Sequence, residues 1–265
     1  MNGLIRLLFV GDVVGPTGCA AIQTFVPALR RELALDAVIA NGENSADNGF
    51  GASARSAEAL LAVVDFLTLG DHAFDQPDLA PTLERDSRII RPANFEGERP
   101  GHGWGTFVAA GVTIGVTNLL GKVFMRPAVT SAAAAADQAI QALREAGARA
   151  IMIDMQAEAT SEKQGMGWYL AGRVAAVLGT HTHVPTADLR ILPGGTAYVS
   201  DVGMTGGRDG VIGFDRDWLL RTMVTGERPG APRPAERPMK LDAVLLEIDA
   251  STGQTVAAER VFREE

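Results

Sequence analysis

The sequence predicts an α/β fold built around largely parallel β-sheet. Apolar runs rich in β-branched residues alternate with helix-like segments along most of the 265 residues. Several of these runs are apolar throughout, as is typical of strands that are covered on both faces. A chain of this length can bury a sizeable core, and we expect one domain over residues 1–265.

The strand-like and helix-like segments can be assigned in chain order. Strands are expected at residues 5–10, 37–40, 66–69, 106–109, 112–117, 150–153, 175–178, 197–200 and 241–248. Helices are expected at residues 18–33, 53–63, 77–85, 131–146 and 165–173. The alanine run from Ala132 to Ala136 strongly favours a helix, and Gly147 is a suitable stop just beyond its end.

Proline and glycine gather between residues 225 and 238, near the end of the sequence. The residues are Gly226, Pro229, Gly230, Pro232, Pro234 and Pro238. This composition predicts an irregular loop. Two strand-like segments follow at 241–248 and 255–262, and the short stretch between them predicts a C-terminal hairpin that completes a sheet.

Composition and charge argue against several classes of protein. The formal net charge is −8, which disfavours stable nucleic-acid binding because that depends on clustered Lys and Arg. Cys19 is the single cysteine, so the sequence provides no disulfide framework and no multi-cysteine zinc site, and we expect a cytoplasmic protein. No apolar run approaches the roughly 18 residues of a membrane span, so we expect no membrane association.

Polar side chains that can bind metals follow five of the apolar runs. They are Asp12, Glu43 with Asn44, Asp71 with His72, Gln156, and His181 with His183. Ligands bind at the carboxyl ends of strands in open α/β sheets, and this mixture of oxygen and nitrogen donors suits manganese, iron, zinc, cobalt or magnesium. Taken singly, members of this set can have purely structural roles, since Asn44 can cap a helix and the two histidines can form a polar pair. Their recurrence after five strands favours one shared metal site.

The same residues stand in motifs that resemble a known family. The segments 11–15 (GDVVG), 41–44 (NGEN), 70–72 (GDH) and 179–183 (GTHTH) are similar to the ordered motifs of calcineurin-like metallophosphoesterases. The segments 91–95 (RPANF), 157–163 (AEATSEK) and 201–206 (DVGMTG) resemble one bacterial branch, the YmdB-like phosphodiesterases. The likeness extends over nearly the whole chain. It implies a four-layer αββα sandwich in which two mixed sheets are flanked by helices.

The resemblance also implies a centre of two divalent metals. Asp12, Asn44 and His183 would hold the first metal, Glu43 would bridge, Asp71, Gln156 and His181 would hold the second, and His72 would contact substrate or protonate the leaving oxygen. Two positions depart from the family pattern, because Asp71 stands in place of an asparagine and Gln156 in place of a histidine. Both departures fall on the second metal. Iron or manganese is the favoured ion, and magnesium or zinc is also compatible.

Further candidates for the substrate site or its surroundings are Asp75, Arg91, Asn94 and Thr160. Asp75 can orient the His72 ring or cap the following helix. Arg91 can contact phosphate or belong to a surface loop. These alternatives stay open from the sequence alone.

The expected activity is hydrolysis of a phosphodiester by a hydroxide that the two metals activate. The resemblance favours 2′,3′- or 3′,5′-cyclic nucleotides, so the expected partner is a small phosphorylated substrate. The alternatives are a phosphomonoesterase and a regulatory binding protein with a weakened second metal site. A homo-oligomer is also compatible with the sequence.

Overall fold

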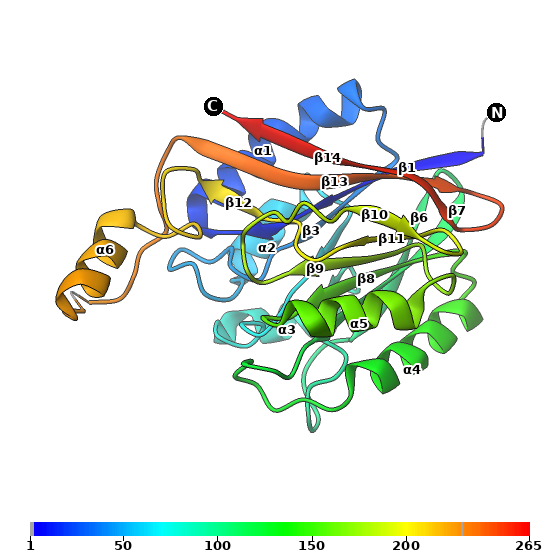
Figure 1. The fold of residues 1–265 in the computed structure, drawn as a ribbon, viewed down its shortest axis with the longest axis horizontal. Helices are drawn as coiled ribbons and strands as arrows, with labels where there is room; N and C mark the ends of the chain where they lie inside the picture. The colour runs from blue at the N-terminus through cyan, green and yellow to red at the C-terminus, as the bar shows by residue number, and fades with distance from the viewer. Residues whose placement is uncertain (1–2, 229) are drawn as a thin grey trace.

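The computed structural model describes residues 3–228 and 230–265, and its elements form four layers (Figure 1). Two β-sheets lie face to face, and helices cover the outer side of each. Apolar side chains fill the space between the sheets and the space between each sheet and its helices. The αββα sandwich is therefore confirmed.

The first sheet combines the beginning of the chain with its end. Its order is β2 (Asp12–Val13), β12 (Met204–Gly207), β13 (Met239–Asp249), β1 (Leu4–Val10), β3 (Ala37–Asn41), β4 (Phe66–Thr68) and β5 (Ile89–Ile90), and β14 (Thr255–Glu264) pairs with β13. Strands β1, β3, β4 and β5 are parallel, whereas β13 is antiparallel to both β1 and β14. The carboxyl ends of the parallel strands therefore meet at one edge.

The second sheet is formed by the middle of the chain. Its order is β10 (Arg190–Leu192), β11 (Thr196–Val199), β9 (Ala176–Thr180), β8 (Ala150–Gln156), β7 (Val112–Leu120) and β6 (Trp104–Ala109). The four inner strands are parallel, and the edge strands β10 and β6 are antiparallel to their neighbours. Both sheets are thus mixed, as expected.

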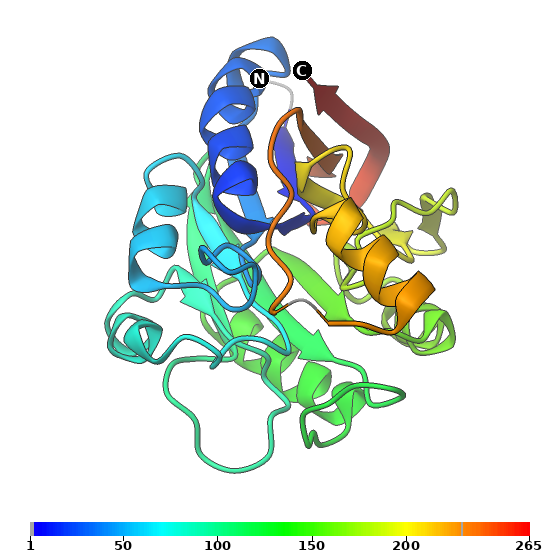
Figure 2. The same cartoon turned by 90° about the vertical axis from the view of Figure 1, so that its left-hand side faces the viewer.

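Helices cover the two outer faces. The first sheet is covered by α1 (Gly15–Glu32), α2 (Ala54–Leu61), η1 (Pro77–Leu79) and α3 (Ala80–Arg85), and the second by α4 (Ala132–Glu145) and α5 (Thr160–Leu170). Figure 2 shows the blue helices of the first sheet and the green helices of the second on opposite sides. The period-two alternation of β1 fits this layering, because Leu8 and Val10 face the helices while Leu7 and Phe9 face the other sheet.

Helix α5 begins earlier than the sequence predicts. The expected range is 165–173, but the helix runs from Thr160 to Leu170. Residues 160–164 (TSEKQ) are all polar, so no apolar periodicity marks the first turns of the helix in the sequence. Gly167 is a poor helix former that nevertheless lies inside it. Gly167 has a packing reason, since a Cβ there would lie 2.5 Å from Cδ2 of the Tyr198 ring.

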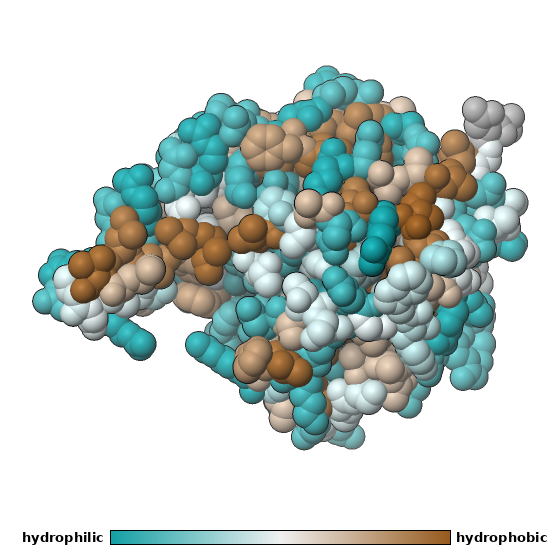
Figure 3. All heavy atoms as spheres, in the orientation of Figure 1, coloured by the Kyte–Doolittle hydropathy of each residue, from teal (hydrophilic) through white to brown (hydrophobic). Residues whose placement is uncertain are grey.

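Helix α6 (Arg216–Thr225) is not predicted by the sequence pattern, and it projects from the body of the sandwich (Figure 1). Each of its residues is described, and none of them is buried. Leu220, Met223 and Val224 are exposed, and apolar atoms form a continuous band over this helix in Figure 3. Leu219 packs against the buried cluster of Val14, Met204 and Phe214, so this contact holds the helix together with its cap and its connections to the body.

The proline-rich segment connects α6 to β13. Residues 226–228 and 230–238 lie outside helices and strands, and Pro229 lies outside the described residues. Within the part of the chain that the structure describes, no helix is both long enough and apolar enough to cross a membrane.

Candidate metal centre

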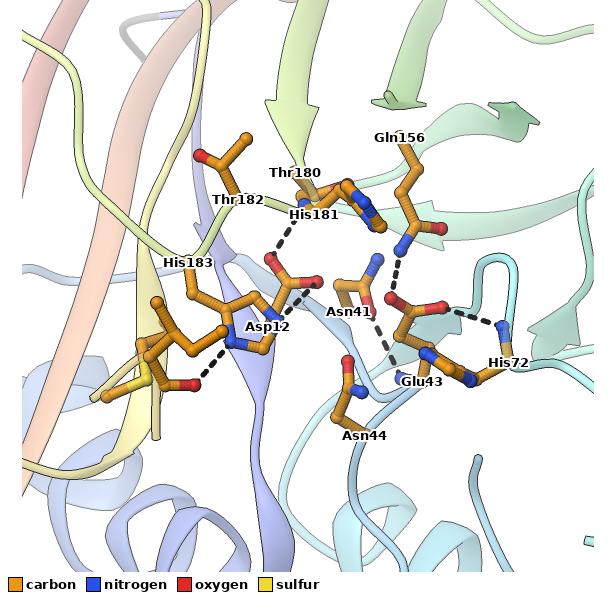
Figure 4. A network of polar contacts seen from close by, with 12 residues as sticks. Asp12, Asn41, Glu43, Asn44, His72, Gln156, Thr180, His181, Thr182 and His183 are labelled. Carbon is orange, nitrogen blue, oxygen red and sulfur yellow. Dashed lines mark hydrogen bonds and ion pairs between the residues drawn. The ribbon is translucent and has the colours of Figure 1, made fainter. Parts of the chain in front are cut away.

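The predicted ligands gather where strands of both sheets end (Figure 4). Strand β1 leads to Asp12, β3 to Glu43 and Asn44, β4 to Asp71 and His72, β8 to Gln156, and β9 to His181 and His183. Parallel strands within each sheet deliver these side chains to the same edge. Gly70 makes the close approach possible, because a Cβ at this position would overlap the side chains of Glu43 and Gln156.

Asp12, Asn44 and His183 form one donor set. The Oδ1 atoms of Asp12 and Asn44 are buried and have no hydrogen-bond partner among the described residues. Asp12 Oδ1 lies 3.8 Å from His183 Nε2. His183 Nδ1 lies 2.7 Å from the carbonyl oxygen of Ile212, which favours a proton on Nδ1 and leaves the Nε2 lone pair available. Two orphaned oxygens beside a free imidazole nitrogen fit a divalent cation.

Glu43, Asp71 and His181 form the second donor set. One ligand atom from each lies within 4.8 Å of the others. His181 Nδ1 lies 3.1 Å from Asp71 Oδ1, and the backbone N–H of His72 donates to Glu43 Oε2 at 3.2 Å. Because Glu43 immediately precedes Asn44 in the chain, the two sets are adjacent and Glu43 stands at their junction.

Gln156 lies among the acidic members of the second set. Its Oε1 accepts a hydrogen bond from the backbone N–H of Asp71 at 3.1 Å. Its Nε2 donates to Glu43 Oε1 and to Asp71 Oδ1. The amide group thus offsets the repulsion between two carboxylates, and its oxygen can reach a cation only if the side chain rotates.

Burial governs the ionisation of these groups. It raises the pKa of Asp12 to about 7, together with the nearby charge of Asp201. It also raises the pKa of Glu43 well above its usual value, and the charge of Asp71 acts in the same direction. Burial lowers the pKa of His183, which keeps that ring neutral. A cation would compensate the cost of ionising the carboxylates, so the electrostatics favour metal binding.

A buried ion pair supports the turn that carries both histidines. His181 and His183 have positive φ angles of 95° and 64°, which are uncommon for residues other than glycine. Between them, Thr182 donates to Asp201 Oδ2 from its backbone N–H at 3.0 Å and from its hydroxyl at 2.8 Å. Lys163 Nζ lies 2.9 Å from the same oxygen, and both charged side chains are about 1% exposed. The Lys163–Asp201 pair therefore holds the strained turn in place.

Asp154 is a structural hub that the sequence pattern alone does not single out. Its carboxylate accepts hydrogen bonds from Thr68 at 2.5 Å, Thr180 at 2.6 Å and Asn41 at 2.9 Å, so it links strands of both sheets. Asn41 in turn accepts the backbone N–H of Glu43 at 3.0 Å. A signal is nevertheless present, because Asp154 and Gln156 are two residues apart and share one face of β8.

His72 lies beside the second donor set. Its Nδ1 is 2.7 Å from Asp75 Oδ2 and its Nε2 is 3.7 Å from Asp71 Oδ2. The Phe50 ring packs against it edge-on at 5.2 Å. Asp75 does not cap the next helix, since Gln76 occupies the N-cap position of η1. Of the two interpretations of Asp75, the structure supports the one in which it orients the imidazole.

Arg91, Asn94 and Thr160 do not join the cluster. The Arg91 guanidinium donates to the carbonyls of Pro92, Arg99 and Pro100, which supports the surface-loop interpretation. Asn94 is buried, and its amide bonds the backbone of Leu120 and Thr130. Thr160 is exposed at the first turn of α5. The first two residues shape loops near the site.

Comparison with known proteins is consistent with this geometry. The model of the YmdB-like protein family matches residues 8–261. The chain is 40% identical to a 2′,3′-cyclic-nucleotide 2′-phosphodiesterase of Bacillus subtilis, over 97% of both proteins. It superposes on a phosphatase from Mycoplasma pneumoniae with a TM-score of 0.91 and 33% identity, covering all of this chain and 95% of that one.

A more distant likeness concerns the fold alone. A calcineurin-like phosphoesterase from Bacillus subtilis superposes with a TM-score of 0.57 at 13% identity, covering 98% of this chain and 90% of the other. Because the family model matches almost the entire length of the chain, the chain belongs to the YmdB-like family, and it has the calcineurin-like metallophosphoesterase fold.

Proposed function

We propose that this protein is a metal-dependent phosphodiesterase that hydrolyses cyclic nucleotides, with 2′,3′-cyclic nucleotides as the favoured substrates. The observation that carries the proposal is the adjacency of two donor sets, one with orphaned buried oxygens, joined at Glu43 and Asn44. The named activity of the Bacillus subtilis relative supports the choice of substrate. The expected ligand is thus a small nucleotide.

The two donor sets fit two divalent ions. Asp12, Asn44 and His183 would hold one ion, Asp71, Gln156 and His181 the other, and Glu43 would lie between them. Divalent metals bound there supply Lewis acidity towards the phosphate oxygens and lower the pKa of a bound water molecule towards about 7. Oxygen donors outnumber imidazoles, which favours iron or manganese over zinc, with magnesium also compatible.

Net charge explains how this acidic site can attract an anion. Asp12, Glu43 and Asp71 together contribute three negative charges when ionised, whereas two divalent ions contribute about four positive charges. About one positive charge remains for the phosphate. The binding of phosphate therefore depends on metal loading.

His72 is placed to donate a proton to the leaving oxygen. Its Nδ1 is held by Asp75 at 2.7 Å, so Nε2 is the atom that faces the donor sets. A carboxylate in that position fixes the orientation of the ring. General-acid assistance of this kind contributes roughly 10²–10⁴-fold to the rate.

Two alternatives have an observation in their favour. The Mycoplasma pneumoniae relative is described as a phosphatase, which supports hydrolysis of phosphomonoesters. The hydrogen bonds that Gln156 donates to two carboxylates support a regulatory protein with a weakened second metal site. The two alternatives and the proposed activity predict different results in one experiment.

The test is phosphorus NMR of 2′,3′-cyclic AMP incubated with protein reconstituted with manganese or iron. The cyclic phosphate signal should give way to a phosphomonoester signal, and a chelator should prevent this. His183→Ala should abolish turnover, whereas His102→Ala, which changes an exposed histidine outside the cluster, should retain it. Release of inorganic phosphate from 3′-AMP, with 2′,3′-cyclic AMP left intact, would favour the phosphatase. No turnover of the cyclic nucleotide with manganese, iron, magnesium or zinc would overturn the proposal.

A further inference from the structure

A small cavity opens beside the second donor set. Its volume is about 220 Å³. Its lining consists of Asp71, His72 and His181 together with Phe50, Phe124, Met125 and Arg126. One wall therefore consists of candidate metal ligands and His72, and the facing wall is the tip of the loop formed by residues 121–130.

This loop is fastened at both of its ends. The Glu162 carboxylate at the start of α5 accepts the backbone N–H groups of Lys122 and Val123 at 3.0–3.1 Å. At the other end, Thr130 donates its backbone N–H to the carbonyl of Asn94 at 2.9 Å. Gly121 has no space for a side chain, since a Cβ would lie 2.5 Å from that of Ala157. The anchors set the tip at the cavity.

Two side chains at the tip are exposed and contribute little to the stability of the fold. Phe124 is 86% exposed and has a φ of 64°, a region that a bulky residue rarely adopts. Arg126 is exposed, and within residues 3–228 and 230–265 its guanidinium has no hydrogen-bond or ion-pair partner. Strained and exposed residues of this kind cluster at ligand-binding sites.

The size of the cavity decides which part of a nucleotide it can enclose. Pockets that bury a whole drug-sized ligand measure about 300–1,000 Å³. A volume of about 220 Å³ suits a phosphate with its sugar, so the base would remain at the rim, where Phe124 lies. Phe50 cannot turn towards the base easily, because it is packed against both His72 and Phe214.

We infer that the 124–126 tip is the nucleoside-recognition element of this site, with Phe124 stacking on the base and Arg126 pairing with the phosphate. This inference rests on the proposed function for the position of the phosphate. Stacking on an aromatic side chain tolerates every base, so the element gives affinity for nucleotides without strong base selectivity. Arg126 adds a positive charge on the wall opposite the carboxylates.

Equilibrium binding of reaction products tests both roles without requiring turnover. Calorimetry on the manganese-loaded protein would compare 3′-AMP with ribose 3-phosphate, which lacks the base. Phe124→Ala should weaken 3′-AMP binding by about 5- to 150-fold and leave ribose 3-phosphate unchanged. Arg126→Gln should weaken both ligands equally, and Phe124→Trp should retain 3′-AMP binding. Val123→Ala, an exposed neighbour outside the cavity lining, is the matched control.

The outcomes separate this inference from the proposed function. If the parent hydrolyses cyclic nucleotides but Phe124→Ala binds 3′-AMP as the parent does, the recognition element is refuted and the activity stands. If the parent hydrolyses nothing but Phe124→Ala selectively loses 3′-AMP, the element stands and the activity is refuted. Equal losses for both ligands in Phe124→Ala, or no nucleotide binding by the parent, would also overturn the inference.

Discussion

Replacing Lys163 by methionine should destabilise the protein by about 3–5 kcal/mol, the usual cost of leaving one member of a buried ion pair alone. Lys163 and Asp201 are almost fully buried, and Nζ lies 2.9 Å from Oδ2. Methionine fills a similar volume, so little of the loss would come from a cavity. The Asp201 carboxylate would keep its hydrogen bonds from Thr182 and Gly203 but would lose its ion pair with Lys163.

Scanning calorimetry measures this effect directly. At roughly 2–4 °C per kcal/mol for a domain of this size, the melting temperature should fall by about 6–20 °C. The double variant Lys163→Met/Asp201→Asn should recover a large part of the loss, because no buried charge is left unpaired. The exposed pair Arg88–Asp86 is the matched control, and Arg88→Met should cost no more than about 1 kcal/mol.

The same variant should impair the metal site, because Thr182 lies between His181 and His183 and is bonded to Asp201. Metal affinity should therefore fall together with stability. A loss in Lys163→Met no larger than in Arg88→Met, with metal affinity unchanged, would refute the role assigned to the pair.

Three further perturbations test the site. Gln156→His should tighten zinc binding relative to manganese without changing the number of metals per chain; elemental analysis showing one metal in the parent and two in the variant would mean that the second site is eroded. His72→Ala should retain the metals but lower turnover at least about 10²-fold, and less for nitrophenyl esters, whereas equal losses for all leaving groups would exclude proton donation. The pKa of Asp12 in the folded, metal-free protein is raised to about 7. Its contribution to the free energy of unfolding is therefore fully present below about pH 4 and is lost as the pH rises through about 7. Metal affinity should fall by up to about tenfold per pH unit below about pH 7, and Asp12→Asn should remove the pH-dependent stability contribution; its persistence in that variant would contradict the assignment.

The strands and most helices could be predicted because their signals are local. Apolar β-branched runs mark the inner strands, and the alanine run marks α4. The short strands β2, β5, β10 and β12 have two to four residues and form through tertiary pairing, so no local pattern identifies them.

Helix α6 escapes prediction although its ends carry recognisable caps. Asp215 accepts a hydrogen bond from the Trp218 N–H at 2.7 Å, and Gly226 closes the helix with a φ of 73°. The proline-rich stretch that follows makes the whole region resemble a loop. Cap residues are therefore the signal that identifies this helix.

The candidate ligands could be predicted because each follows an apolar run. The ion pair that holds the turn of His181 and His183 could not be predicted, because Lys163 and Asp201 are 38 residues apart and their pairing depends on the fold. For Arg91 the sequence leaves two roles open, phosphate contact and a place in a surface loop. Only the carbonyl contacts of its guanidinium in the structure favour the loop.

Anomalous diffraction at the manganese edge, from crystals of protein reconstituted with manganese, tests the central claim most directly. Two peaks about 3.5–4 Å apart are expected, one contacted by Asp12, Asn44 and His183 and the other by Asp71, Gln156 and His181, with Glu43 between them. A single peak, or peaks away from these side chains, would contradict a two-metal centre at this edge of the sandwich.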